Sequence, residues 1–151
     1  MSKIQKVLTT GKTHTTSSDA GGLSRSHNGN LNIHLTAPGN SAVREHVFAD
    51  IQPHPTAEQL FAGAWSACYS AAVGIVAKEK KVELPADTSV DIEVDLGVAG
   101  NEYFLQARVN LNAPGLDQEV ATAIAHAADQ ICPYSKATRG NIDVVLTAVV
   151  A

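Results

Sequence analysis

The sequence has few of the features that mark a secreted or disulfide-stabilised protein. Only two of its 151 residues are cysteines, which excludes a small fold held together by several disulfides. Its first 16 residues, MSKIQKVLTTGKTHTT, contain no apolar run of the kind that a secretory signal needs. We therefore expect a cytoplasmic protein whose cysteines are free, metal-bound or catalytic, and not a structural disulfide.

Long runs of one charge sign are also absent. The net charge is -4, and the densest cationic group is Lys78, Lys80 and Lys81. Such a group is typical of a solvated helix end, where cations favour the C-terminus, so no nucleic-acid partner is expected. Hydrophobic residues make up 44% of the chain and charged residues 17%. These values favour a globular fold over a disordered chain, and the length predicts one domain over residues 1–151.

The spacings that bind metals are missing as well. None of the six histidines has an HExxH or His-x-x-x-His spacing, and Cys68 and Cys132 form no CxxC. We therefore expect no metal and no other bound cofactor. A hydrolase in which a histidine activates Cys68 is an alternative, although no local motif supports it.

One long helix is predicted at about residues 56–81. Thr56 and Gln59 have the spacing of a capping box, and the pattern that follows is apolar on nearly every side. Residues 60–77 carry no formal charge over 18 positions, which is the lower limit for a membrane span. Because alanine, glycine and serine dominate the stretch, we interpret it as a buried central helix and expect no membrane partner.

The remaining elements predict an α+β fold. A second helix begins near Leu116–Asp117 and ends at Cys132, since Pro133 disfavours helical geometry in the residue before it. Alternating patterns predict strands at 90–96 and 103–111 that are joined by a turn at Gly100–Asn101. Residues 142–150 are apolar on both faces, which predicts a strand covered on both sides. Further strands are expected within residues 1–51, at about 3–10, 23–26, 31–35 and 43–51, so that the region from about 88 to 151 reads β-β-α-β.

The surroundings of Cys68 decide whether it is an inert core thiol or a reactive one. Glu58 lies on the same helix, and a buried carboxylate requires a cation such as arginine. An arginine near Cys68 would also favour the thiolate. Ten positions separate Glu58 from Cys68, or about 15 Å along a straight helix. Either the helix bends or breaks near Gly63, or a long arginine bridges part of that distance.

Two blocks around the cysteines resemble a known family. AEQLFAGAWSACYSAA around Cys68 and ICPYSKATRGNIDV around Cys132 are similar to the two signature blocks of the organic hydroperoxide resistance proteins in the Ohr/OsmC family. The stretches VELPADTSVDIEVDLG and YFLQARVNLNAPGLDQEVA resemble the middle of the same proteins. The resemblance covers about residues 56–150.

The resemblance implies a thiol peroxidase without metal or flavin. Cys68 would attack an organic, fatty-acid-like hydroperoxide and become a sulfenic acid, and Cys132 would resolve it as a disulfide. A dithiol, typically a lipoyl group on a lipoylated protein, would reopen that disulfide. Glu58 would orient the activating arginine. The implied fold is an intertwined homodimer with antiparallel sheets wrapped around central helices and active sites at the subunit interface.

The helix dipole agrees with these roles, since the C-terminal end of a helix does not favour a thiolate at Cys132. Pro133 ends the helix there, which predicts a thiol that is free to move.

The chain departs from the family where the arginine is expected. The first hairpin tip, Thr16–Gly22, contains none, so Arg25 and Arg44 are the candidates. The apolar walls of a substrate pocket are predicted to include Leu60, Phe61, Trp65 and Tyr69, although core packing competes for at least half of these. A different function stays open, in which the pocket holds an acyl-like or peroxide ligand and the thiols act as a redox sensor with little turnover.

Overall fold

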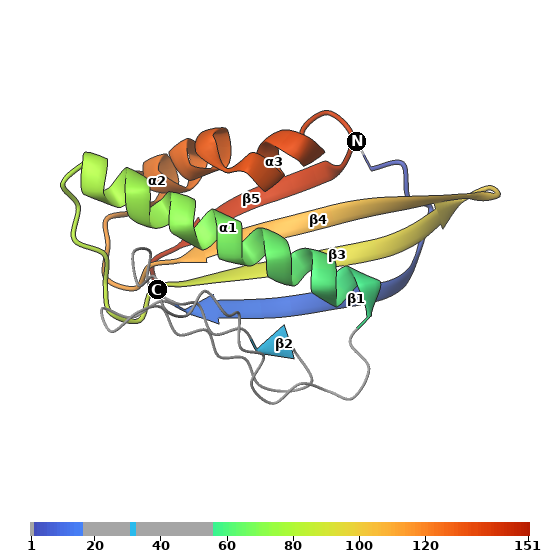
Figure 1. The fold of residues 1–151 in the computed structure, drawn as a ribbon, viewed down its shortest axis with the longest axis horizontal. Helices are drawn as coiled ribbons and strands as arrows, with labels where there is room; N and C mark the ends of the chain where they lie inside the picture. The colour runs from blue at the N-terminus through green and yellow to red at the C-terminus, as the bar shows by residue number, and fades with distance from the viewer. Residues whose placement is uncertain (1, 17–30, 33–55) are drawn as a thin grey trace, which may run out of the picture.

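A computed structural model describes residues 2–16, 31–32 and 56–151. Helices and strands share one chain without regular alternation, which confirms the α+β class (Figure 1). In chain order the elements are β1 (Lys6–Thr16), β2 (Leu31–Asn32), α1 (Ala57–Glu79), β3 (Ser89–Ala99), β4 (Glu102–Asn112), α2 (Gln118–Ile131), α3 (Pro133–Thr138) and β5 (Asp143–Val149).

The sheet is mixed. Its strand order is β2-β1-β3-β4-β5, and β3 is antiparallel to both β1 and β4. β5 instead runs parallel to β4, so this pair departs from the antiparallel sheets that the family resemblance implied. The physical reason is the connection, because α2 and α3 carry the chain back across the sheet before β5 begins, as a parallel pair requires.

The β3–β4 hairpin forms where the alternating pattern predicts it. Ala99 pairs with Glu102, so Gly100 and Asn101 are the two loop residues. Gly100 has φ 59°, the positive value that the first loop position of a type II′ turn needs and that glycine adopts without a steric penalty. The turn therefore sets the register between β3 and β4, two of the three 11-residue strands.

Helix α1 is continuous from Ala57 to Glu79. The predicted capping box is present, with the Gln59 N–H donating to Thr56 Oγ1 at 3.1 Å and the Thr56 N–H donating to Gln59 Oε1 at 3.0 Å. Gly63 does not break the helix. Among the described residues α1 is the one helix long and apolar enough to cross a membrane, but half of its most apolar window is buried in the fold. The core helix of a soluble protein passes the same test.

The first turn of α1 rests directly on β1. A Cβ atom added to Gly11 would lie 2.4 Å from the Gln59 backbone nitrogen, so only glycine permits this approach. Two turns further along, Ser66 and Thr15 share a buried hydrogen bond of 2.7 Å between their hydroxyl oxygens. Strand β1 is longer than the predicted strand at 3–10, and these contacts explain why, because its second half carries the helix.

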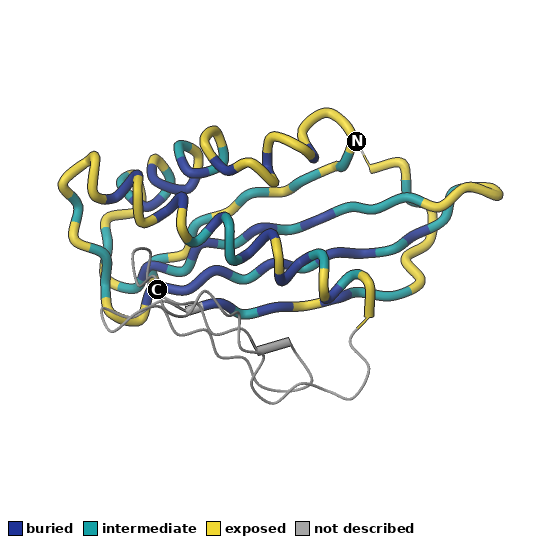
Figure 2. Tube along the Cα trace, in the orientation of Figure 1, coloured by how far each residue is buried: buried dark blue, intermediate teal, exposed yellow. Residues whose placement is uncertain are grey.

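The two faces of the sheet differ in chemistry. One face packs against α1 and α2, and the central strands are largely buried along their middle (Figure 2). On this face residues lie opposite one another in rows across four strands, such as Thr13, Ile92, Val109 and Leu146. The other face carries no helix among the described residues and is mostly polar. On β5 the residues of this outer face are exposed, Val145 at 57%, so within one chain the prediction that β5 is covered on both faces is wrong.

Candidate active site

The two thiols lie against each other where α1 meets the corner between α2 and α3. The Cys68 and Cys132 sulfurs are 3.4 Å apart, with the Cys132 thiol placed to donate to Cys68. Both cysteines are free. A disulfide bond is about 2.05 Å long, so the sulfurs need to approach by only a little more than 1 Å to form one.

Cys132 belongs to two helices at once. Its N–H donates to the Ala128 carbonyl at 2.9 Å, which closes α2, and its carbonyl accepts from the Lys136 N–H at 3.0 Å, which opens α3. Pro133 is the first residue of α3, a position where its missing N–H costs nothing. The prediction that Pro133 leaves this thiol free to move is wrong, because a new helix begins there and Cys132 is 0% exposed.

Cys68 is only partly buried, and its surroundings do not favour the thiolate. Burial raises the pKa of the Cys68 thiol, a backbone hydrogen bond from Tyr134 lowers it, and the adjacent Cys132 thiol raises it further. The net pKa lies above the ordinary value. Among the described residues no cation contributes to this pKa. A group outside them must therefore supply the positive charge if Cys68 is to react at neutral pH.

Glu58 and Cys68 are not neighbours within one chain. Because α1 is unbroken, the expected bend at Gly63 is absent and about 15 Å of helix separates the two positions. The remaining possibility is a bridging arginine, and Arg25 and Arg44 both lie outside the described residues.

The described arginines are engaged elsewhere. Arg139 ties α3 to α2, donating from Nη2 to the Asp129 carboxylate and to the Asp129 carbonyl, each at 2.8 Å. Arg108 donates from two nitrogens to the Asp95 carboxylate on the outer face of the sheet, at 2.7 and 2.8 Å. Neither guanidinium has a hydrogen bond to a thiol.

Two of the four predicted pocket walls are core residues with bonded polar atoms. Trp65 and Tyr69 are both 0% exposed. The Trp65 indole N–H donates to Ser135 Oγ at 3.1 Å, and the Tyr69 hydroxyl donates to the Ala125 carbonyl at 2.8 Å. These two contacts join α1 to α3 and to α2 on either side of the thiols. The sequence pattern marked both rings as apolar and could not indicate where their polar atoms point.

The other two predicted walls remain accessible. Leu60 is exposed, and the partly buried Phe61 packs edge-on against Trp65 with 5.8 Å between ring centroids. Both lie on the side of α1 that carries Cys68, at helical spacing. The exposed side chains of Ile131 and Tyr134 flank Cys132 in the chain. Apolar surface is therefore available beside the half-buried thiol, which suits an apolar substrate.

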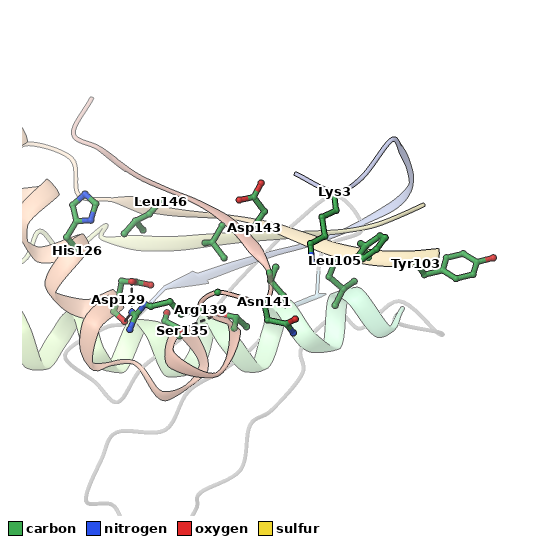
Figure 3. Close-up of a pocket in the computed structure, with 15 residues that line it drawn as sticks. Lys3, Tyr103, Leu105, His126, Asp129, Ser135, Arg139, Asn141, Asp143 and Leu146 are labelled. Atoms are coloured by element: carbon green, nitrogen blue, oxygen red, sulfur yellow. Dashed lines mark hydrogen bonds and ion pairs between the residues drawn. The ribbon is translucent and has the colours of Figure 1, made fainter. Parts of the chain in front are cut away.

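A separate cavity of about 860 Å³ lies on the far side of the α2–α3 corner, against β4 and β5 (Figure 3). Leu105, Val144 and Leu146 contribute apolar side chains, while Asp129, Ser135 and Arg139 contribute polar ones. Ser135 thus lies between this cavity and Trp65. In the described part of the chain, no three His, Cys, Asp or Glu side chains cluster as a metal site would require.

The sequence matches a family model and several curated proteins. Residues 49–147 match the model described as OsmC-like protein. The chain is 40% identical over 90 residues to an organic hydroperoxide resistance protein of Xanthomonas axonopodis pv. citri (strain 306), spanning 60% of this chain and 63% of that one. It is 37% identical over 89 residues to OhrB of Bacillus subtilis (strain 168), spanning 59% and 65%. Each of these two matches covers less than two thirds of the relative's length.

Solved structures give a longer match. An organic hydroperoxide resistance protein from Elizabethkingia anophelis is 32% identical, with a TM-score of 0.61 over 98% of this chain and 100% of that one. OhrB of Bacillus subtilis is also 32% identical, with a TM-score of 0.60 over 91% and 96%. The similarity therefore extends over nearly the whole fold.

Proposed function

The chain belongs to the OsmC-like family, as the two cysteine blocks predicted, and we propose that it is a cysteine-based peroxidase that reduces organic hydroperoxides to alcohols. The observation that carries this proposal is the pair of free thiols 3.4 Å apart, of which one is partly exposed and the other buried. Such a pair is suited to oxidation at one sulfur and resolution by the other.

The reaction has two oxidative steps. The Cys68 thiolate attacks the terminal oxygen of the hydroperoxide, forming an S–O bond and breaking the O–O bond. The leaving alkoxide takes up a proton and departs as the alcohol. The Cys132 sulfur then attacks the Cys68 sulfenic acid, which forms the Cys68–Cys132 disulfide and releases the hydroxyl with the Cys132 proton as water.

Recycling uses a dithiol such as a lipoyl group on a lipoylated protein. Because Cys132 is buried and Cys68 is partly exposed, the incoming thiolate attacks the Cys68 sulfur, and the bonding pair of the disulfide moves to Cys132. The second thiol of the reductant then attacks the mixed disulfide and frees Cys68. No metal or other bound cofactor takes part.

A homodimer would complete the site. The exposed face of α1 carries Leu60, Ala64, Ala71 and Ile75 at helical spacing, on the side where Cys68 lies. An apolar stripe of this kind suits a second copy of α1, with active sites at the interface. A partner subunit docked on this stripe would also cover the partly exposed Cys68. Glu58 would there orient the guanidinium of Arg25 or Arg44.

A redox-sensing or ligand-binding protein of low turnover is the second candidate. The raised pKa of Cys68 favours it, because a protonated thiol attacks peroxides slowly. Either protein would act in the cytoplasm, on apolar ligands, without nucleic-acid or membrane partners.

Stopped-flow oxidation of the reduced protein by an organic hydroperoxide separates the two. We expect a sulfenic acid at Cys68 followed by the disulfide, and turnover with dihydrolipoamide. Cys68→Ser should abolish peroxide consumption, whereas Cys132→Ser should leave the first oxidation intact and prevent disulfide formation. Oxidation without turnover would favour the redox sensor, whereas no oxidation at Cys68 would exclude both the peroxidase and the redox sensor and leave the ligand-binding protein.

A further inference from the structure

We propose that two buried hydrogen bonds, Trp65 to Ser135 and Tyr69 to Ala125, set the distance between the thiols and so control the disulfide-forming step. Trp65, Ser135 and Tyr69 are in this view positioning residues, since none of them touches the peroxide. The inference rests on the proposed function for its kinetic consequence. Its equilibrium consequence, the stability of the Cys68–Cys132 disulfide, does not require peroxidase activity.

The first step is that the Cys132 sulfur moves with the α2–α3 corner. The backbone of Cys132 is bonded into α2 through its N–H and into α3 through its carbonyl. Its side chain is buried in the core cluster with Trp65, Tyr69 and Ala125. With the backbone held from both sides, the position of the corner relative to α1 determines how close the two sulfurs lie.

The second step is that these two contacts tie the corner to α1 on both sides of the thiol pair. On α1, Trp65 comes three residues before Cys68 and Tyr69 directly after it. Their acceptors lie three residues after Cys132, at Ser135, and seven before it, at Ala125. All four of these bonded residues are buried. A buried donor that loses its acceptor is strongly disfavoured, so each contact resists separation of the helices.

The two donor groups, the Trp65 indole N–H and the Tyr69 hydroxyl, also keep their protons over the working pH range. The indole N–H does not titrate, and burial raises the pKa of the Tyr69 hydroxyl far above neutrality, so it keeps its proton. The two contacts therefore hold the sulfurs together at any pH at which the protein works. A sulfenic acid formed at Cys68 is therefore already next to the Cys132 thiol, and the disulfide can form without a loop movement that brings the two together.

The test compares Ser135→Ala with Thr138→Val. Both remove one buried hydroxyl from α3, but the Thr138 hydroxyl donates to the Ser135 carbonyl within α3 itself and not to α1. In stopped-flow oxidation we expect Ser135→Ala to lengthen the lifetime of the Cys68 sulfenic acid by about three- to tenfold, the range of one net hydrogen bond. The rate of sulfenic acid formation should change by less than about twofold. Thr138→Val should leave both steps at the wild-type rate.

Equilibration with dithiothreitol redox buffers gives a readout that is independent of peroxide. The disulfide of Ser135→Ala should be easier to reduce by the same three- to tenfold, or about 15–30 mV. Trp65→Phe should produce a similar shift, and the double variant should add nothing to Trp65→Phe, since the same contact is already lost. Tyr69→Phe tests the second contact by the same two measurements and serves if Ser135→Ala does not fold.

Three results would overturn the inference. One is an equal effect of Ser135→Ala and Thr138→Val, which would indicate general destabilisation of α3. Another is a shorter sulfenic acid lifetime in Ser135→Ala. The third is additive shifts of Trp65→Phe and Ser135→Ala. Should the wild-type protein form no sulfenic acid at all, the proposed function fails, while the redox equilibrium still decides whether these contacts hold the thiols together.

Discussion

On the outer face of the sheet, Lys12 pairs with Glu93 and Arg108 pairs with Glu93 and Asp95, whereas the thiols in the helix layer lie in apolar surroundings. The carboxylate of Asp95 belongs to a residue that is 2% exposed and also accepts from Thr10 and Gln106. The outer face thus satisfies its charges from neighbouring strands. At the thiol site the two sulfurs are in close contact, but the positive charge that would favour the thiolate must come from another segment. The charged pairs of the outer face therefore stabilise the fold, whereas the apolar thiol site carries the proposed chemistry.

The largest effect on stability is expected from Arg108→Ala, which removes the ion pairs of Arg108 with Glu93 and Asp95 on the outer face of the sheet. It leaves the buried Asp95 carboxylate without its cation and should lower the free energy of unfolding by about 3 kcal/mol, since removing one partner of a buried pair costs about 3–5 kcal/mol and Arg108 is itself partly exposed. Urea unfolding measures it. The Arg108 guanidinium holds the pKa of Asp95 below its usual range. The difference should therefore persist at neutral pH and shrink as the pH falls below about 4.

The matched control for that experiment is Lys12→Ala. Lys12 pairs with Glu93 at 2.7 Å but is 54% exposed, so its loss should cost less than about 1 kcal/mol. Equal losses in the two variants would mean that burial of Asp95 does not distinguish the pairs. Reaction of Cys68 with hydroperoxide should be unchanged in both.

Gly11→Ala disrupts the close contact between β1 of the sheet and the first turn of α1. The added methyl group would overlap the Gln59 backbone, which cannot move without displacing the first turn of α1, so about 2 kcal/mol of stability should be lost. Gly97→Ala is the control, because the three atoms nearest to its Cβ would all belong to the side chain of Ile4 and none to the backbone, and Ile4 precedes β1, where the chain can shift without moving α1. Thermal unfolding should place Gly97→Ala much closer to the wild type, and the reverse order would contradict this account of the β1–α1 contact.

Arg25→Ala and Arg44→Ala test which arginine supplies the positive charge that the thiol site needs. One of them should raise the pKa of Cys68 further, and a pKa higher by one lowers the thiolate fraction at neutral pH about tenfold. The pH dependence of Cys68 alkylation in a Cys132→Ser background measures this change. Arg139→Ala, whose guanidinium bonds to Asp129, should leave that profile unchanged. An unaltered profile in both of the first two variants would exclude both arginines as the activating cation.

The smallest effect concerns His14 and Asp91, which face each other on the outer surface. The hydrogen bond to Asp91 raises the pKa of His14, and although burial alone would raise that of Asp91, its bonds to His14 and Asn112 lower it. The pair therefore adds stability that is present below about pH 6.5 and is lost as the pH rises through the raised pKa of His14. Toward low pH it is lost as Asp91 is protonated.

His14→Ala should accordingly reduce stability by under about 1 kcal/mol near pH 5.5, because both side chains are partly exposed. The reduction should be smaller at pH 8. Urea unfolding at the two pH values measures it, and a larger loss at pH 8 would contradict the assigned direction.

Local signals in the sequence were sufficient for most of the elements. The Thr56–Gln59 spacing predicted where α1 begins, Pro133 predicted the end of α2, and Gly100–Asn101 predicted the hairpin. The sequence shows that Asp91, Glu93 and Asp95 occupy alternate positions of one strand and that Arg108 lies on the next. Which of these acids Arg108 pairs with depends on the register of β3 and β4. The helix α3 was missed because Pro133 was taken only as an ending, although proline is also a favourable first residue of a helix.

The sequence by itself determined the class of fold, the two thiols as the candidate chemistry and, through its cysteine blocks, the family. These conclusions follow from short-range spacing and from residue identity, both of which can be read from the sequence without knowing how the chain folds. The tertiary structure decided that Cys132 is buried against a partly exposed Cys68, that β5 is parallel to β4, and that Trp65 and Tyr69 bond to the α2–α3 corner. Such features depend on how elements far apart in the sequence pack together, from 37 residues for β4 and β5 to 70 for Trp65 and Ser135, and packing geometry leaves no local pattern in the sequence.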